Sequence, residues 1–330
     1  MGAARGRPRT WRWEPATDSW NDAMWAAFRG SVADRLLKRT MGGTARRFAT
    51  RNLHQPIPTE AMLELILKRE PQVPLEAEVI CPDVLCGLSM NEIAQQRVFH
   101  GKRACRLADF FEIEGAPSDS VMVRGDLRKV RWIGRGMTRG SIEVQGDVGM
   151  HLGAYMRGGR IAVQGNAGDW VGAEMQGGVI VVSGDAGGQV GAAYRGSLRG
   201  MNRGTILIGG NTGLEIGMRM RRGTIVVGGM ARDFAGLQMK GGTILLLGGA
   251  ELRVGAWMQR GTIISLKPIV MMPTFRPSGR SNPVFMNLLA RELRPLGVDF
   301  PLLSTEGSYA RFAGDAAVPG KGEIFVWEPH

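Results

Sequence analysis

The stretches "SIEVQGDVGMHLGAYMRGG" (residues 141–159) and "RIAVQGNAGDWVGAEMQGG" (residues 160–178) decide the fold of this chain. They follow each other directly, and both place the same apolar residues and glycines at the same positions of a 19-residue unit. The leading apolar residue forms a column at Val121, Ile142, Ile161, Ile180, Ile206, Ile225, Ile244 and Ile263. Seven extra residues, around "YRGSLRGMN" (residues 194–202), interrupt the step once. A fixed period of about 20 residues is typical of a repeat architecture.

Each unit opens with I-x-V-x-G, turns at a second glycine, and closes with methionine, two variable residues and glycine. The methionines are Met137, Met156, Met175, Met201, Met220, Met239 and Met258. Short apolar alternation bounded by glycine favours a strand, and glycine permits the sharp turns between strands. Copies stacked at about 4.8 Å would align isoleucine on isoleucine and methionine on methionine. We therefore predict a mainly β protein in which residues 121–265 form a parallel β-helix of about seven 19-residue rungs.

Two alternatives to a β-helix fail for this glycine-rich region. A low-complexity linker would not hold apolar columns in phase through seven units, and residues 121–263 contain no proline. A leucine-rich solenoid has a similar period, but its L-x-x-L-x-L-x-x-N pattern is absent.

The flanks divide into three segments. Residues 1–75 are predicted to form a basic helical extension, with an amphipathic helix over residues 19–37 and a second helix after Thr59 that is stopped by Pro71. In that second helix Met62, Leu65 and Ile66 share one face. Residues 76–120 are predicted to cap the start of the repeat, and the capping box Ser89-x-x-Glu92 predicts a helix there.

Residues 266–330 are predicted to cap the other end of the repeat. Three prolines end the repeat pattern, and Asn282-Pro283 is typical of a helix start, here continuing through Leu293. A β-helix exposes strand edges at both ends, so helical caps are expected on both.

Composition excludes several classes of protein. Of the 330 residues 44% are hydrophobic, but no apolar run approaches the roughly 18 residues of a membrane span. The basic N-terminus is not followed by an apolar segment, which disfavours a secretory signal. Cys81, Cys86 and Cys105 include no CxxC pair, so reduced thiols in a cytoplasmic protein are expected. The net charge of +12 is concentrated in residues 1–51, and no nucleic-acid-binding motif accompanies it.

No catalytic or metal site is predicted. The four histidines are far apart in the sequence, and Gly320-Lys321 is followed by glycine where a phosphate-binding loop needs serine or threonine. One column of polar residues is a candidate binding surface. It follows the methionines and comprises Thr138, Arg157, Gln176, Asn202, Arg221, Lys240 and Gln259. It is either a solvated face or a partly basic stripe, with Arg157, Arg221 and Lys240 binding an acidic tail or partner, aided by Arg219, Arg222 and Arg260.

The segments around the repeat resemble a known family. They are "ICPDVLCGLSMNEIAQQRVFHGKRACRLADFFEIEG" (residues 80–115), "MMPTFRPSGR" (residues 271–280) and "FAGDAAVPGKGEIFV" (residues 312–326). With the repeat they are similar to the C subunits of formylmethanofuran dehydrogenases and to their bacterial counterpart in the formyltransferase/hydrolase complex. The resemblance covers about residues 76–330. The repeat alone is less specific, because the C-terminal domain of glutamate synthase has similar glycine repeats.

This resemblance implies a right-handed β-helix packed beside the A, B and D subunits, which carry the chemistry. It implies that no cofactor is bound by this chain alone and that a methanofuran-type coenzyme and any metals are bound by the partner subunits. The glutamate-rich tail of that coenzyme is a candidate ligand of the basic stripe. No catalytic residue of the family falls on this chain.

Three alternatives remain open. Thirty-five arginines against seven lysines suggest a GC-rich genome, which favours the formyltransferase/hydrolase complex over a molybdenum or tungsten dehydrogenase. A glutamate-synthase-related enzyme and a free-standing anion-binding solenoid are the alternatives of other classes.

Overall fold

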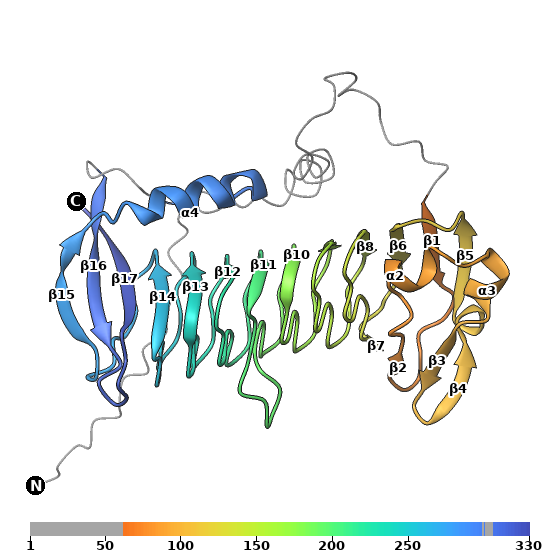
Figure 1. The fold of residues 1–330 in the computed structure, drawn as a ribbon, viewed down its shortest axis with the longest axis horizontal. Coiled ribbons are helices and arrows are strands. Elements are labelled where there is room, and N and C mark those ends of the chain that lie inside the picture. The colour runs from red at the N-terminus through yellow and green to blue at the C-terminus, as the bar shows by residue number, and fades with distance from the viewer. Residues whose placement is uncertain (1–61, 299, 301–305) are drawn as a thin grey trace, which may run out of the picture.

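A computed structural model describes residues 62–298, 300 and 306–330, and a sheet of 13 strands dominates it. The repeat contributes eight of these strands in chain order. They are β6 (Ser120–Arg124), β8 (Ser141–Gln145), β9 (Arg160–Val163), β10 (Gln176–Val182), β11 (Arg203–Ile208), β12 (Thr224–Val227), β13 (Lys240–Leu246) and β14 (Arg260–Ser265). Each pairs with the next in parallel. Figure 1 shows them side by side along the long axis.

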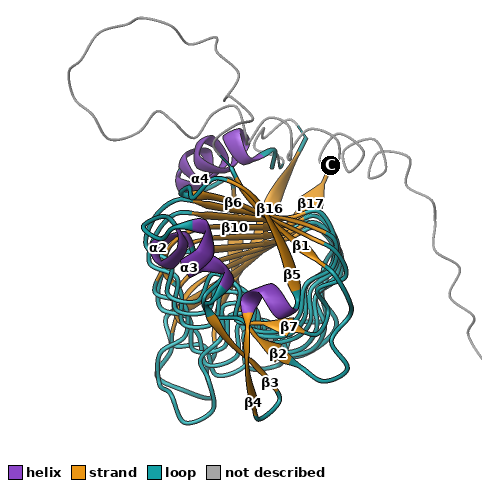
Figure 2. Cartoon of the chain, turned by 90° about the vertical axis from the view of Figure 1, so that its right-hand side faces the viewer, coloured by secondary structure: helices purple, strands orange, loops and turns teal. Residues whose placement is uncertain are grey.

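The strand register confirms the columns predicted from the sequence. Ile142 pairs with Ile161, Ile161 with Ile180, and the series continues through Ile206, Ile225 and Ile244 to Ile263. A second column of single parallel bridges runs from Leu127 through Val148, Ala167, Ala186, Thr212 and Ala231 to Ala250. Each unit thus returns to the same two places, and Figure 2 shows the intervening loops superposed when the stack is viewed from its end.

The inner core consists of the apolar columns. The isoleucines of the repeat and all seven closing methionines are buried. The closing glycines are needed for this packing, as Gly178 illustrates. Its φ is +89°, and an added Cβ would lie 2.7 Å from Cε of Met156 in the preceding unit. Only glycine meets both conditions without strain.

The N-terminal end of the sheet differs from the prediction. Residues 63–67 form strand β1 (Leu63–Leu67), which is parallel to β6 and antiparallel to β5 (Phe111–Gly115), so the helix expected after Thr59 is wrong over these residues. In a stretch this short, the spacing of the apolar residues fits both the helical and the strand period. Burial of Leu63 and Leu65 and pairing on both edges decide in favour of a strand.

The rest of the N-terminal segment packs against the first units. A small sheet contains β2 (Leu75–Glu76), β3 (Arg97–His100), β4 (Arg103–Arg106) and β7 (Val130–Arg131). The helical pieces are α2 (Pro82–Leu85), α3 (Met90–Ala94) and the 3-10 turn Leu107–Asp109. The predicted capping box of α3 is confirmed: Glu92 N donates to Ser89 Oγ at 3.3 Å, and Ser89 N donates to Glu92 Oε2 at 2.8 Å.

Strands also extend the C-terminal end of the sheet. β17 (Gly322–Pro329) is parallel to β14, and β16 (Gly307–Gly314) and β15 (Arg276–Ser281) follow in antiparallel order. The expectation that helices cap both ends is therefore wrong in this respect. The terminal backbone groups are satisfied by further strands instead.

Helix α4 (Phe285–Leu293), continued by the 3-10 turn Arg294–Leu296, confirms the helix predicted after Asn282-Pro283. Val284 is its N-cap, and Asn282 Nδ2 instead donates to the carbonyl of Gly307 at 3.1 Å. The helix lies along the outer face of the sheet (Figure 1), in one apolar cluster with the outward side chains Leu207, Val226, Leu245 and Ile264.

The amphipathic helix predicted over residues 19–37 lies outside the described residues. Within the described ranges, no helix is both long and apolar enough to cross a membrane.

Candidate functional site

The predicted polar stripe is a structural column. From the second member onward, each amide donates to the carbonyl of the methionine one unit earlier, at 2.7–2.8 Å: Arg157 to Met137, Gln176 to Met156, Asn202 to Met175, Arg221 to Met201, Lys240 to Met220 and Gln259 to Met239. This main-chain ladder holds the stripe in register whatever side chains it carries.

The side chains of the stripe differ in what they contact. Thr138 is engaged by the N-terminal segment, because its amide donates to Asp83 Oδ2 at 2.7 Å and its hydroxyl donates to the same carboxylate. Arg157 is exposed, whereas Arg221 and Lys240 are half-buried. Among the described residues, Nε of Arg221 has no hydrogen-bond partner although it is buried.

The three predicted cations form two groups. Arg221 and Lys240 are in adjacent units, about 4.8 Å apart along the stack, whereas Arg157 is three units from Arg221, about 14 Å. Arg260 extends the first group, since it pairs in register with Lys240 across β13 and β14. Arg221 and Lys240 of the stripe thus form a compact basic patch together with Arg260, which lies next to the stripe member Gln259.

Not every predicted helper belongs to the stripe. Arg222 is exposed next to the patch. Arg219 is used elsewhere, because its guanidinium donates to Gln238 Oε1 at 2.7 Å and to the carbonyl of Ser197.

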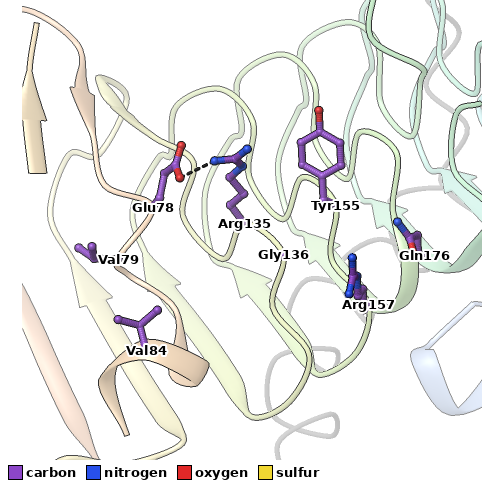
Figure 3. A pocket seen from close by; sticks show the side chains of 8 residues that line it. All are labelled: Glu78, Val79, Val84, Arg135, Gly136, Tyr155, Arg157 and Gln176. Carbon is purple, nitrogen blue, oxygen red and sulfur yellow. Dashed lines mark hydrogen bonds and ion pairs between the residues drawn. The ribbon is translucent and has the colours of Figure 1, made fainter. Parts of the chain in front are cut away.

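Arg157 and Gln176 lie instead in an open groove between the repeat and the N-terminal segment. The groove has a volume of about 570 Å³ and is also lined by Glu78, Val79, Val84, Arg135, Gly136 and Tyr155. Figure 3 shows Arg135 paired with Glu78, while Arg157 and Gln176 lie further along the groove. The guanidinium of Arg135 also lies 5.0 Å from the Trp132 ring centroid and 5.5 Å from that of Tyr155. Arg157 is therefore the cation of this groove that no acidic side chain among the described residues neutralises.

A stack of aromatic rings runs beside the groove, and it was not singled out from the sequence. The rings of Trp132 and His151 are 4.1 Å apart and nearly parallel, and Trp170 continues the stack. Tyr194 packs on Trp170 at 4.7 Å and its hydroxyl lies 2.8 Å from His151 Nδ1. Residues 132, 151 and 170 are 19 apart, so the signal was present in the sequence. Because their faces cover one another, they hold the structure together and offer little surface to a planar ligand.

The titratable groups point to structural roles. Burial, followed by repulsion from Arg131, lowers the pKa of His151 from 6.5 to about 4, so this ring is neutral near pH 7. Burial raises the pKa of the Cys81 thiol to about 11, which disfavours the reactive thiolate. Cys81, Cys86 and Cys105 are free thiols. No group of three or more potential metal ligands occurs among the described residues.

Known proteins share this repeat and this fold. The family described as GXGXG motif matches residues 121–270. The C subunit of the tungsten-containing formylmethanofuran dehydrogenase 2 of Methanothermobacter thermautotrophicus is 44% identical over 100 residues, which are 28% of this chain and 37% of that protein. The C subunit of the molybdenum-containing formylmethanofuran dehydrogenase 1 of Methanosarcina barkeri is 37% identical over 98 residues, which are 28% of this chain and 33% of that protein.

A crystal structure gives the longer match. It is that of the formyltransferase/hydrolase complex from Methylorubrum extorquens in complex with methylofuran, one chain of which superposes with a TM-score of 0.73 and 36% identity. The match covers 80% of this chain and 98% of that one. The chain therefore belongs to the family that comprises the C subunits of formylmethanofuran dehydrogenases and the corresponding chain of the formyltransferase/hydrolase complex.

Proposed function

We propose that this chain is the non-catalytic C subunit of a formyltransferase/hydrolase complex, in which it holds the A, B and D subunits together. The observation that carries this proposal is the match to nearly the whole length of one chain of the Methylorubrum extorquens complex at 36% identity.

The architecture suits a scaffold. The parallel sheet, the second column of parallel bridges and the buried inner columns support a right-handed parallel β-helix over residues 121–265, flanked by capping segments 76–120 and 266–330. Such a stack is long and rigid, since each unit is fixed by its neighbours. It offers several parallel faces on which different partners can bind. A cytoplasmic location and a separate role for residues 1–75 stay predictions.

The coenzyme and metals are assigned to the partner subunits, with one contribution from this chain. The patch at Arg221, Lys240 and Arg260 and the separate cation Arg157 would bind carboxylates of a glutamate-rich coenzyme tail. Arg221 and Lys240 are half-buried, and the low-dielectric protein beside them strengthens such ion pairs relative to fully exposed ones. Replacing Arg157, Arg221 and Lys240 by glutamine should weaken binding of a hexaglutamate peptide and make it less dependent on salt. If peptide binding, assembly of the complex and use of the coenzyme are all unchanged, the stripe is only a solvated face.

A second setting has its own support. The similar curated proteins are subunits of tungsten- and molybdenum-containing dehydrogenases, so a dehydrogenase complex is the alternative. Purification of a tagged chain from its native host, with mass spectrometry of proteins recovered in stoichiometric yield, separates the two. The A, B and D subunits with formylmethanofuran-hydrolysing activity and no molybdenum or tungsten would support the first proposal, and either metal would support the alternative. A chain recovered alone would contradict both and favour a free-standing anion-binding solenoid.

A further inference from the structure

The seven extra residues between Gly191 and Met201 form a loop that projects from the stack between β10 and β11. Figure 1 shows it on the side of the stack away from α4. Its base is closed by main-chain hydrogen bonds: Ala193 N donates to Met218 O at 3.0 Å, Gly200 N to Arg219 O at 3.0 Å, and Met201 N to Gly191 O at 2.9 Å. The loop is therefore incorporated into the hydrogen bonding of the neighbouring unit.

Side chains of three other units hold the inner part of the loop. Tyr194 N donates to Glu174 Oε1 at 3.1 Å, its ring stacks on Trp170, and its hydroxyl meets His151. On the other side, the guanidinium of Arg219 donates to the carbonyl of Ser197. Ser197 N also donates to Tyr194 O at 2.9 Å, which closes a tight turn. The aromatic stack and Arg219 thus fix the shape of the loop.

The tip of this ordered loop is apolar and basic. Leu198 is 63% exposed, and Arg195 and Arg199 on either side of it are also exposed. Neither guanidinium pairs with an acidic side chain within the described part of the chain. A single exposed leucine is ordinary on a protein surface. Leu198, however, stands on a loop that is held in one conformation, and fixing a loop in this way costs conformational entropy. The result of that cost is that Leu198 and its flanking arginines are held in a fixed position on the surface.

We propose that residues 194–199 are a docking element that inserts Leu198 into an apolar pocket, rimmed by aspartate or glutamate, on a neighbouring subunit of the complex. This inference rests on the proposed function. A preordered apolar anchor between two like charges meets the physical requirements of an interface hot spot: it loses little entropy on binding, and it is matched by a pocket of opposite charge.

Photo-crosslinking in the intact complex tests the contact. The chain carrying Leu198→p-benzoylphenylalanine should crosslink to one peptide of an A, B or D subunit, and the crosslinked region should contain Asp or Glu. The matched control is the same replacement at Leu288, which is 67% exposed on α4. Crosslinks only within the chain itself, or to a partner region without acidic residues, would overturn the proposal.

Two variants test the energetics. Leu198→Asp, and separately the pair Arg195→Glu and Arg199→Glu, should lower the affinity of the chain for the remaining subunits by about 30-fold or more, the scale of a hot-spot loss. Circular dichroism and thermal melting should show an unchanged fold, because the tip contacts nothing that holds the loop. Leu288→Asp should leave affinity within about threefold. Wild-type affinity for both loop variants, or an equal loss with Leu288→Asp, would refute a specific role of the loop.

The two proposals fail differently. If the wild-type chain recovers the A, B and D subunits and the loop variants do so equally well, the docking element is wrong and the scaffold role stands. If the wild-type chain recovers none of them, the scaffold role is wrong and the docking inference is refuted with it.

Discussion

Replacing Gly178 by alanine should destabilise the stack by about 2–5 kcal/mol. A side chain at a φ of +89° costs about 1–2 kcal/mol relative to glycine. The added Cβ would also lie 2.7 Å from Met156 Cε and 2.9 Å from Gly159 O. The methionine can move, but Gly159 O accepts a hydrogen bond from Val179 N at 3.1 Å and cannot retreat without losing it. Overpacking of this kind adds about 1–3 kcal/mol.

Two other glycines allow the cost of a positive φ to be measured without the steric clash. Gly196 has a φ of +87° and Gly136 a φ of +67°, and an added Cβ at either would meet no atom within 4 Å. Alanine at Gly136, within the stack, should therefore cost only about 1–2 kcal/mol, and at Gly196, in the loop, no more than that. Urea unfolding followed by circular dichroism measures the three midpoints. If Gly178→Ala and Gly136→Ala shift the midpoint equally, close packing of the methionine column against the glycines does not explain the repeat.

Three further outcomes follow from the structure. Met220→Ala should cost about 2–5 kcal/mol because the side chain is fully buried, whereas Met230→Ala, at a side chain that is 42% exposed, should cost well under half as much in the same unfolding measurement. Because the pKa of His151 is lowered from 6.5 to about 4, the unfolded chain binds the proton more readily, so stability should fall as the pH drops from about 6.5 towards 4. Thermal melting across this range should show a smaller decrease for His151→Asn, and an identical decrease would contradict the assignment. Glu78→Gln should change the free energy of unfolding by less than about 1 kcal/mol, since the pair of Glu78 with Arg135 is exposed. The same variant should strengthen binding of a hexaglutamate peptide to the groove, because it leaves the Arg135 guanidinium without its carboxylate partner. Unchanged binding in calorimetry would exclude the groove as an anion site.

The repeat could be predicted from the sequence because each column has one environment. Every isoleucine of the series faces the same inner core, and each closing glycine from Gly159 to Gly261 lies against the methionine of the preceding unit. The same requirement therefore recurs in each unit. The α3 cap was predictable for a similar reason, since Ser89 and Glu92 satisfy each other within four residues. Local chemistry of this kind needs no knowledge of the rest of the fold.

The ends of the sheet could not be predicted in the same way. Leu63–Leu67 is too short for its period to distinguish helix from strand, and its partners β5 and β6 are far along the chain. The outer apolar face had a visible signal, because the residue after the column isoleucine changes from Glu143 and Ala162 to Val181, Leu207 and Val226. The repeat pattern alone does not indicate that helix α4 covers this outer face.

The candidate site shows the same division. The polar stripe was identified correctly as a column, because register follows from the period. The contacts of its members depend on neighbours outside the repeat: Asp83 engages Thr138, and Glu78 neutralises the arginine beside Arg157 in the groove. Arg219 is expected from the sequence to aid the stripe, but its guanidinium donates to the carbonyl of Ser197 and so supports the loop instead.

The columns of the stack can be changed independently, which makes the functional tests selective. Main-chain hydrogen bonds to methionine carbonyls hold the stripe, so replacing Arg221 or Lys240 removes charge without removing a bond of the ladder. The loop likewise depends on Tyr194 and Arg219, whereas Leu198 at its tip contributes nothing to that support. A variant of one column that disturbs assembly but leaves melting unchanged therefore identifies a binding surface. A variant that lowers both identifies a residue of the core.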